Sequence, residues 1–160
     1  MGPSLLLTPM TEGDADFVAR LAADERVMAH IGDGSTWSLE YTAQRVDHAL
    51  SSPEISWFIA RRQNSPVGLF TATERRHATE IGYWIAPECW GQGLAKEIVS
   101  EGLAQLQETG RSAFIARADA SNIASLKVLA RYGFIAQAKE GPGLITLTRV
   151  LPTVPVPPAS

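Results

Sequence analysis

Residues 79–110 restrict the possible folds of this chain more than any other segment. The β-rich run TEIGYWIAP stops at Pro87, because proline cannot donate a hydrogen bond to a sheet. After two closely spaced glycines, apolar residues recur at helical spacing until Gly110, a natural end for a helix. The β-rich run SAFIARAD follows at 112–119. Because a long crossover joins parallel neighbours, we expect strands at 79–86 and 112–119 to lie side by side and parallel.

The other segments predict strands, short turns and helices. The short strand SLLLTPM precedes a helix that Thr11 or Asp14 can cap, and a second helix is expected over 39–50 with Ser38 as its cap. SWFIARR and SPVGLFTAT predict a hairpin across QNS, and NIASLKVLARY predicts a helix that ends at Gly133. FIAQAKE and LITLTRV predict a last hairpin across GPG. This order predicts an α+β fold with a mixed, mostly antiparallel central sheet that contains one parallel strand pair.

A chain of 160 residues, of which 45% are apolar, has the length and the core of one ordinary domain. We expect this domain to occupy residues 1–150 and the proline-rich segment 151–160 to be a disordered tail. The formal charge of −3 comes from interspersed acids and bases, which argues against a nucleic-acid partner. No apolar run is long enough to cross a membrane, so no membrane partner is expected.

The single cysteine, Cys89, excludes an internal disulfide and a zinc site built on cysteines. The three histidines are scattered and share no ligand-like spacing with acidic residues, so no metal is predicted. The apolar run in MGPSLLLTPM is too short for a signal peptide. A reduced, cytoplasmic setting is therefore the expectation.

Two glycines, Gly91 and Gly93, stand where the long helix is predicted to begin. A helix start presents unpaired N–H donors and the positive end of the helix dipole, and glycine lets phosphate oxygens come close to those donors. The spacing fits neither a Walker A loop nor the dinucleotide fingerprint, because Lys96 stands where the latter needs glycine. A phosphate or pyrophosphate is the predicted ligand, and the alternative is that the glycines only permit a tight turn.

The segment WIAPECWGQGLAKEIV resembles motif A of the GNAT superfamily of acyl-CoA-dependent N-acyltransferases, in which a Q/R-x-x-G-x-G/A loop leads into a helix that holds the CoA pyrophosphate. Glu88 stands at the first position of this motif, in place of Gln or Arg. NIASLKVLARYGF and the opening LLLTPMTEGDADFVARLAADERVMAHIGDG are similar to the branch of ribosomal-protein N-terminal (alanine/serine) acetyltransferases. The resemblance covers about residues 4–149 and implies helices on both sheet faces, with acetyl-CoA as co-substrate.

The resemblance also implies which residues bind acetyl-CoA. The backbone before the glycines would pair with the pantetheine, and the loop and helix start would hold the pyrophosphate. Asn122, which suits a helix N-cap, would contact the pantetheine or phosphate arm, and Ser125 would lie near the sulfur. The predicted cofactor-binding residues are Trp84, Ile85, Ala86, Trp90, Gly91, Gln92, Gly93, Leu94, Ala95, Asn122 and Ser125.

An α-amine has a pKa of about 8 and a lysine-type amine a pKa of about 10.4, so both are mostly protonated at neutral pH. Acetyl transfer to an amine therefore requires a base that removes a proton. On a strand, Glu80 shares a face with Gly82 and Trp84. In several enzymes of the resembled family, a glutamate at a similar place is the general base, so Glu80 is the candidate here. The alternative is a solvent-exposed glutamate beside Arg75 or Arg76.

The leaving thiolate needs a proton. Many members of the resembled family supply it from a tyrosine, but Leu129 occupies that position here. Ser125 is therefore the first candidate for the catalytic acid and Tyr132 the second. Alternatively, Ser125 is an ordinary residue of a helix's first turn, and Tyr132 packs under the last hairpin.

The acceptor pocket of the resembled fold lies among the N-terminal helices and their loop. Trp37 and Trp57 are predicted to contact the acceptor together with Glu80, although core positions are the alternative for both tryptophans. The predicted reaction is transfer of an acetyl group to a primary amine by direct attack in a ternary complex. The acceptor is expected to be a protein N-terminal α-amine or a small-molecule amine.

A non-catalytic acyl-CoA-binding or sensing module is the alternative from another functional class. Such a module needs the glycine loop and Asn122 but neither Glu80 nor Ser125. For the oligomeric state, both a monomer and a homodimer are compatible with the edge strands that the last hairpin offers.

Overall fold

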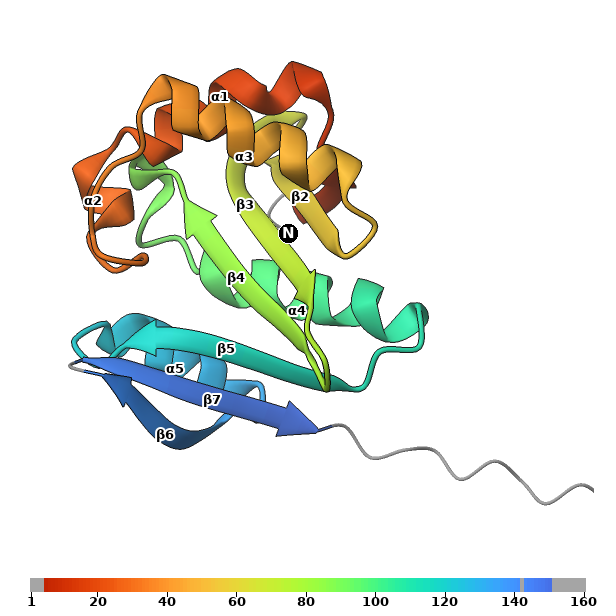
Figure 1. Ribbon diagram of the computed structural model, residues 1–160, viewed down its shortest axis with the longest axis vertical. Coiled ribbons are helices and arrows are strands. Elements are labelled where there is room, and N and C mark those ends of the chain that lie inside the picture. Colours follow the sequence, from red (N-terminus) through yellow and green to blue (C-terminus); the bar gives the residue numbers. More distant parts are fainter. Residues whose placement is uncertain (1–4, 142, 151–160) are drawn as a thin grey trace, which may run out of the picture.

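Seven strands form one mixed sheet in the part of the chain that the structure describes, residues 5–141 and 143–150 (Figure 1). The strand order in this computed structural model is β1-β2-β3-β4-β5-β7-β6. The predicted tail at 151–160 lies outside the described residues. The strands are β1 (Leu5–Pro9), β2 (Ile55–Arg62), β3 (Ser65–Glu74), β4 (Thr79–Ile85), β5 (Ala113–Asp119), β6 (Ile135–Gly141) and β7 (Leu144–Val150).

Neighbouring strands are antiparallel except for β4 and β5, which are parallel. This pairing confirms the prediction drawn from the crossover. The hairpin of β2 and β3 turns through Gln63 and Asn64, whose positive φ angles of 52° and 67° match the twist of the two strands. β6 and β7 form the second predicted hairpin.

β4 and β5 pair only where they begin. Residues 79–81 of β4 lie beside residues 114–116 of β5, whereas β4 continues to Ile85 on its other edge, paired with β3. Figure 1 shows the two strands diverging beyond this short contact. The backbone of 82–85 therefore has one edge that no described strand covers, and the sheet opens there.

Helices cover both faces of the sheet, as predicted. One face carries α1 (Ala15–Ala22), α2 (Glu25–Met28) and α3 (Leu39–Ser51), and the other carries α4 (Leu94–Glu108) and α5 (Ile123–Arg131). The 3-10 turns η1 (Glu12–Asp14) and η2 (Pro87–Cys89) precede α1 and follow β4. The sequence patterns missed α2, a single turn that Asp24 caps by accepting a hydrogen bond from the Arg26 amide. None of the described helices is both long and apolar enough to span a membrane.

Alternation along β4 divides its side chains between two cores. Ile81 and Tyr83 contact the core under α4 and α5, whereas Trp84 belongs to the core under α1, α2 and α3. This division agrees with the predicted faces of the strand. Glu80 and Gly82 share the face of Trp84 by the same alternation, so the candidate base lies on the side of α1–α3.

Candidate active site

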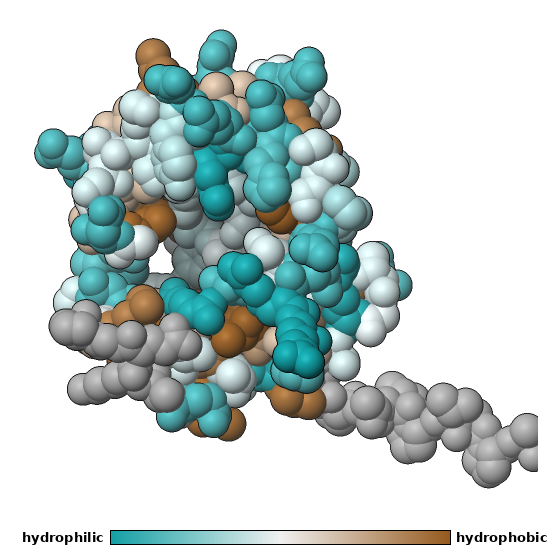
Figure 2. Space-filling view, viewed as in Figure 1, coloured by the Kyte–Doolittle hydropathy of each residue, from teal (hydrophilic) through white to brown (hydrophobic). Residues whose placement is uncertain are grey.

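A cavity of about 1030 Å³ occupies the opening between β4 and β5. Its wall includes β4, the glycine loop before α4 and the start of α5, together with residues of α2, α3 and the loop between them. Figure 2 shows this face of the molecule hollowed between the half that carries α1–α3 and the half that carries β5 and β7. The cavity therefore joins residues from both helical layers.

The glycine loop has the backbone conformation of an anion site. Gly91 and Gly93 have positive φ angles of 80° and 74°, and Gly93 is the N-cap of α4. Other residues are strained at such angles, so the loop itself requires glycine. A Cβ atom built on either glycine meets no heavy atom of the described residues within 4 Å. Leu94 and Ala95 also line the cavity, so an anion has open access to the amides at the helix start.

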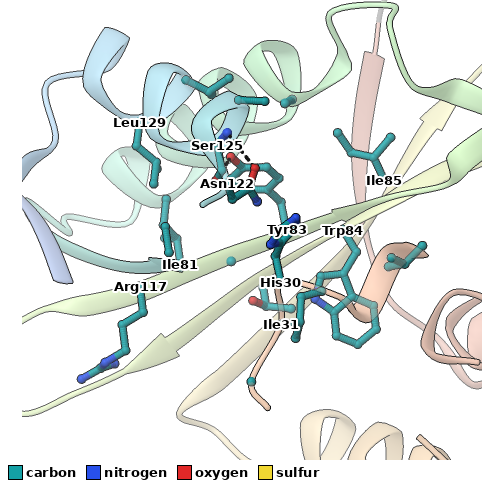
Figure 3. Close-up of a pocket in the computed structure, with 18 of the residues that line it drawn as sticks. His30, Ile31, Ile81, Tyr83, Trp84, Ile85, Arg117, Asn122, Ser125 and Leu129 are labelled. Atoms are coloured by element: carbon teal, nitrogen blue, oxygen red, sulfur yellow. Dashed lines mark hydrogen bonds between the residues drawn. The ribbon is translucent and has the colours of Figure 1, made fainter. Parts of the chain in front are cut away.

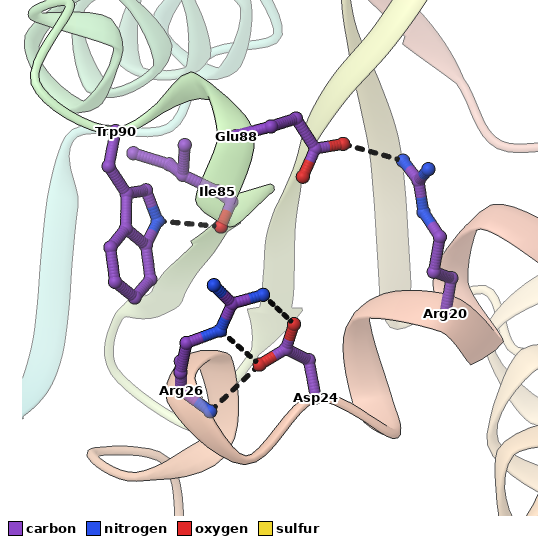
Figure 4. Close-up of polar contacts among 6 residues, drawn as sticks. All are labelled: Arg20, Asp24, Arg26, Ile85, Glu88 and Trp90. Carbon is purple, nitrogen blue, oxygen red and sulfur yellow. Dashed lines mark hydrogen bonds and ion pairs between the residues drawn. The ribbon is translucent and has the colours of Figure 1, made fainter.

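Two arginines hold the glycine loop from outside the cavity. Arg62 of β2 donates to Gln92 Oε1 at 3.0 Å and to Glu97 Oε2 at 2.9 Å. Arg20 of α1 pairs with Glu88 at 3.2 Å (Figure 4). Gln92 was predicted to bind the cofactor, but its side chain belongs to this brace and is not among the residues that line the cavity.

The end of β4 supplies the edge that was predicted to pair with pantetheine. Trp84 and Ile85 line the cavity, whereas Ala86 is fully buried and does not line it. The indole Nε1 of Trp90 donates to the Ile85 carbonyl at 2.9 Å (Figure 4). A strand-like ligand that uses this carbonyl would share it with the half-exposed indole or displace that indole.

Asn122 and Ser125 bring the start of α5 against β4. Asn122 Oδ1 accepts a hydrogen bond from the Ser125 amide at 3.2 Å, which makes Asn122 the N-cap that the sequence predicted. Ser125 Oγ lies 2.7 Å from Tyr83 Oη, and Figure 3 shows this hydrogen bond inside the cavity. Burial raises the pKa of Tyr83, so the phenol is protonated at neutral pH. Sequence reasoning missed Tyr83, because the strand pattern gives its face but not the helix that docks there.

Tyr132, the second candidate for the catalytic acid, lies at the far end of α5. Its side chain packs against the core under α4 and α5, and it is not among the residues that line the cavity. Ser125 is in the first turn of the same helix, and seven residues of helix correspond to roughly 10 Å. The helix therefore brings only one of the two predicted acids to the opening.

Glu80 lines the cavity on the side of α1–α3. Its Oε1 atom accepts hydrogen bonds from Arg75 Nε, at 2.9 Å, and from Arg117. The side chain is 22% exposed, so this carboxylate is neither deeply buried nor simply solvated. Glu80 thus has the position that a base requires, and it is also paired with Arg75, as the structural alternative predicted.

Trp37 and Trp57 also line the cavity. Trp57 is 7% exposed and belongs to the core under α1–α3. The Trp37 ring meets the Trp84 ring edge to face at 5.1 Å, and the Arg45 guanidinium lies 5.7 Å from the Trp37 ring centre. Each predicted acceptor tryptophan is therefore a core residue and a wall residue at once.

The profile of the family described as "Acetyltransferase (GNAT) domain" matches residues 4–135. The chain belongs to the GNAT acetyltransferase family. A curated relative, the uncharacterized N-acetyltransferase YoaA of Bacillus subtilis (strain 168), is 28% identical over 146 residues, which are 86% of this chain and 81% of the relative. Family membership confirms the predicted enzyme class, an acetyl-CoA-dependent N-acetyltransferase.

Solved structures share the fold of this GNAT acetyltransferase. RimL, a ribosomal L7/L12 alpha-N-protein acetyltransferase in complex with coenzyme A, superposes with a TM-score of 0.80 at 17% identity, over 92% of this chain and 94% of RimL. Spermidine N-acetyltransferase from Vibrio cholerae, in complex with CoA and spermine, has a TM-score of 0.82 at 16% identity, over 92% of this chain and 95% of that one. At these identities the likeness shows the fold alone, and the two proteins act on different acceptors.

The remaining reactive side chains of the GNAT acetyltransferase have ordinary surroundings. Burial, with a smaller contribution from Glu88, raises the pKa of the Cys89 thiol, which also lines the cavity. His30 Nδ1 lies 3.9 Å from Asp119 Oδ2. Within the described residues, no group of three or more His, Cys, Asp or Glu side chains is arranged to hold a metal ion.

Proposed function

We propose that this GNAT acetyltransferase transfers the acetyl group directly to a primary amine, with acetyl-CoA and the acceptor bound at the same time. The observation that carries the proposal is the continuous cavity between β4 and β5, which reaches from the glycine loop to Glu80. A covalent acetyl-enzyme would need an activated nucleophile, and the raised pKa of Cys89 keeps that thiol protonated. Direct attack is therefore the simpler route.

The residues at the glycine end fit acetyl-CoA. The open space beside Gly91 and Gly93 admits phosphate oxygens to the amides that begin α4, and Asn122 faces the same cavity. The uncovered edge of β4 offers backbone groups to the pantetheine. When bound there, acetyl-CoA supplies a thioester as the acetyl donor.

Glu80 is proposed as the general base that takes a proton from the acceptor amine, directly or through a water molecule. The Arg75 and Arg117 side chains orient its carboxylate toward the cavity by holding Oε1, which leaves Oε2 to accept the proton. Removing that proton makes the amine nucleophilic, because the protonated amine has no lone pair.

Ser125 is proposed as the proton donor to the sulfur that leaves, with Tyr83 as its partner. A proton moves from Ser125 Oγ to sulfur, and Tyr83 Oη replaces it through the 2.7 Å hydrogen bond. The phenol holds a proton at neutral pH, since burial raises the pKa of Tyr83. The amine nitrogen bonds to the acetyl carbon as the carbon–sulfur bond breaks, and the nitrogen then loses a second proton. One of the two protons that leave the nitrogen restores Tyr83 through solvent and the other is released to solvent, which balances the reaction.

The test is release of free CoA thiol when purified protein is mixed with acetyl-CoA and a panel of amines. Initial rates measured against both substrates are expected to give intersecting reciprocal plots, because both must be bound before transfer. Mass spectrometry of protein mixed with acetyl-CoA alone is expected to show no added acetyl group. Acetyl-CoA binding without thiol release for any amine would overturn the proposal in favour of the non-catalytic module, and parallel plots would overturn direct transfer.

A further inference from the structure

We infer that the acceptor of this enzyme carries a carboxylate close to its reactive amine, and that the Arg45 guanidinium binds that carboxylate. The inference rests on the proposed function and adds the chemical class of the acceptor. It predicts an amino acid, or a peptide with an acidic residue beside its N-terminus, in preference to a polyamine or an uncharged amine.

The charge of the cavity wall differs from that of the whole chain. The formal charge of the chain is −3. In the described part of the chain, however, the Arg, Lys, His, Asp and Glu side chains that line the cavity are basic with one exception, Glu80: they are Arg26, His30, Arg45, Arg75, Glu80 and Arg117. One carboxylate among four guanidinium groups gives a wall that favours an anionic ligand.

Two of the groups that would attract a cationic acceptor already contact arginines of the protein itself. A polycation is recognised by carboxylates and by the faces of aromatic rings. Glu80 accepts hydrogen bonds from Arg75 and from Arg117. The Trp37 ring has the Arg45 guanidinium 5.7 Å from its centre. A polyamine would have to compete with arginines for both groups.

Arg45 is the arginine of this wall whose own polar needs are unmet. It projects from α3, is partly buried, and forms no ion pair or hydrogen bond within the described residues. Its Nε atom is inaccessible to solvent and has no partner. The residues three and four positions away on α3 are Thr42, Tyr41, His48 and Ala49, so its own helix offers no acid. The rest of this side chain belongs to the cavity wall, and a ligand carboxylate bound at the terminal nitrogens would neutralise a charge that no described acid pairs with.

The neighbouring basic groups are better satisfied. Arg26 donates to both carboxylate oxygens of Asp24, at 3.1 and 2.8 Å (Figure 4). His30 lies near Asp119. Arg45 lies over the Trp37 ring, and Trp37 packs with Trp57, Ile31 and Val27, which also line the cavity, in the core under α1–α3. This side of the cavity therefore combines a guanidinium that no described acid pairs with and a wall that includes apolar side chains, which suits an amino acid with an apolar side chain.

The experiment compares acceptors that differ only in the carboxylate. L-amino acids are tested beside their carboxamides, and N-terminal peptides with Asp as second residue beside the same peptides with Asn, with spermidine as the cationic acceptor. In each pair that the enzyme acetylates, the specificity constant kcat/KM is expected to be 10- to 100-fold higher for the compound with the carboxylate than for the compound with the carboxamide. The two arms distinguish a free amino acid from a protein N-terminus as the source of the carboxylate.

The variant Arg45→Gln is expected to lower kcat/KM by a similar 10- to 100-fold for carboxylate acceptors, mainly through KM, and to leave the carboxamides unchanged. Arg45→Lys keeps the charge and should recover part of the loss. Arg131→Gln, an exposed arginine on α5, is the matched control and should behave as wild type. Calorimetry provides a second readout: amino acid binding to the CoA-loaded enzyme should weaken in Arg45→Gln, while acetyl-CoA binding stays unchanged.

Three results would overturn the inference while leaving the proposed function intact. These are thiol release that favours spermidine or carboxamides, an Arg45→Gln variant with wild-type selectivity, and a loss in that variant of acetyl-CoA affinity rather than acceptor affinity. Absence of thiol release with every amine is a different outcome, because it contradicts the proposed function itself.

Discussion

The two ends of the cavity are built in different ways. The glycine end consists of backbone amides at the start of α4 and of the uncharged residues Asn122 and Ser125 at the start of α5. The proposed acceptor end consists of side chains from α2, α3, the loop between them and several strands, and it holds the lining arginines together with Trp37 and Trp57. Under the proposed function, one end would recognise a constant chemical group through the backbone, whereas the other would select its ligand through side chains. Substitutions should therefore separate the two functions.

The largest expected effect is at the acceptor end. Glu80→Gln removes the proposed base while keeping the shape of the side chain, so kcat/KM should fall by about 100- to 10,000-fold. Acetyl-CoA affinity, measured by calorimetry, should stay unchanged because the glycine end is intact. Glu101→Gln, at an exposed position of α4, is the matched control. Unchanged turnover in Glu80→Gln would remove Glu80 from the catalytic site.

The next effect is at the glycine end. Gly93→Val places a branched side chain in the open space beside the helix start, so acetyl-CoA affinity should fall by about 10- to 100-fold through lost charge-assisted hydrogen bonds. Gly110→Val is the control, since Gly110 has a similar φ of 90° and a Cβ there also meets no described atom within 4 Å. Both variants have similar backbone strain, because the two φ angles are similar. Only Gly93→Val should lose affinity for acetyl-CoA. Equal affinities would contradict the phosphate cradle.

A smaller effect is expected where the two ends meet. Tyr83→Phe removes the partner of Ser125, and kcat should fall by about tenfold with little change in acetyl-CoA affinity. Because Tyr83 and Ser125 act as one unit, adding Ser125→Ala should lower kcat by less than the product of the single effects. Fully multiplicative effects in this double-mutant cycle would show that the two hydroxyls act independently.

The smallest effect on catalysis is expected when the ion pair between Asp14, at the start of α1, and Arg61 of β2 is removed. Asp14 is 8% exposed, accepts from Thr11 and pairs with Arg61 of β2. Burial alone would raise the pKa of Asp14, but the hydrogen bonds from Thr11 and the Arg61 pair outweigh it and lower that pKa. Asp14→Asn should cost about 2 kcal/mol of unfolding free energy at neutral pH, and kcat/KM should be unchanged in the folded enzyme.

The pH dependence of that cost follows from the sign of the pKa shift. A lowered pKa in the folded state means that the carboxylate stabilises the fold above the unfolded pKa of about 4, and that this contribution disappears as pH falls through the folded pKa. Urea unfolding of wild type and Asp14→Asn should therefore give stabilities that converge below about pH 4. A constant difference between the two proteins across that range would contradict the ion-pair account.

Particular residues show how far sequence reasoning reached. Pro87, Gly93 and Asn122 act through local backbone geometry, so their roles as strand stop, helix start and helix cap were predictable and are confirmed. Tyr83 and Arg45 were missed. Tyr83 matters through its hydrogen bond to Ser125, which is far away in the sequence, and Arg45 matters because no described residue satisfies its Nε atom. Tyr132 was the second candidate for the catalytic acid, but it is the C-cap of α5, seven residues beyond Ser125, and it packs against the core.

By itself, the sequence determined the order of the strands and of every described α-helix except α2, the crossover that makes β4 and β5 parallel, and a glycine loop at a helix start. These features depend on hydrophobic period, on proline and glycine, and on capping groups, all of which act within a few residues. Only the tertiary structure decided that β4 and β5 separate after three paired residues, and which side chains from distant elements share the opening. The physical reason is that charge pairing and burial depend on distances between segments, and no local pattern contains those distances.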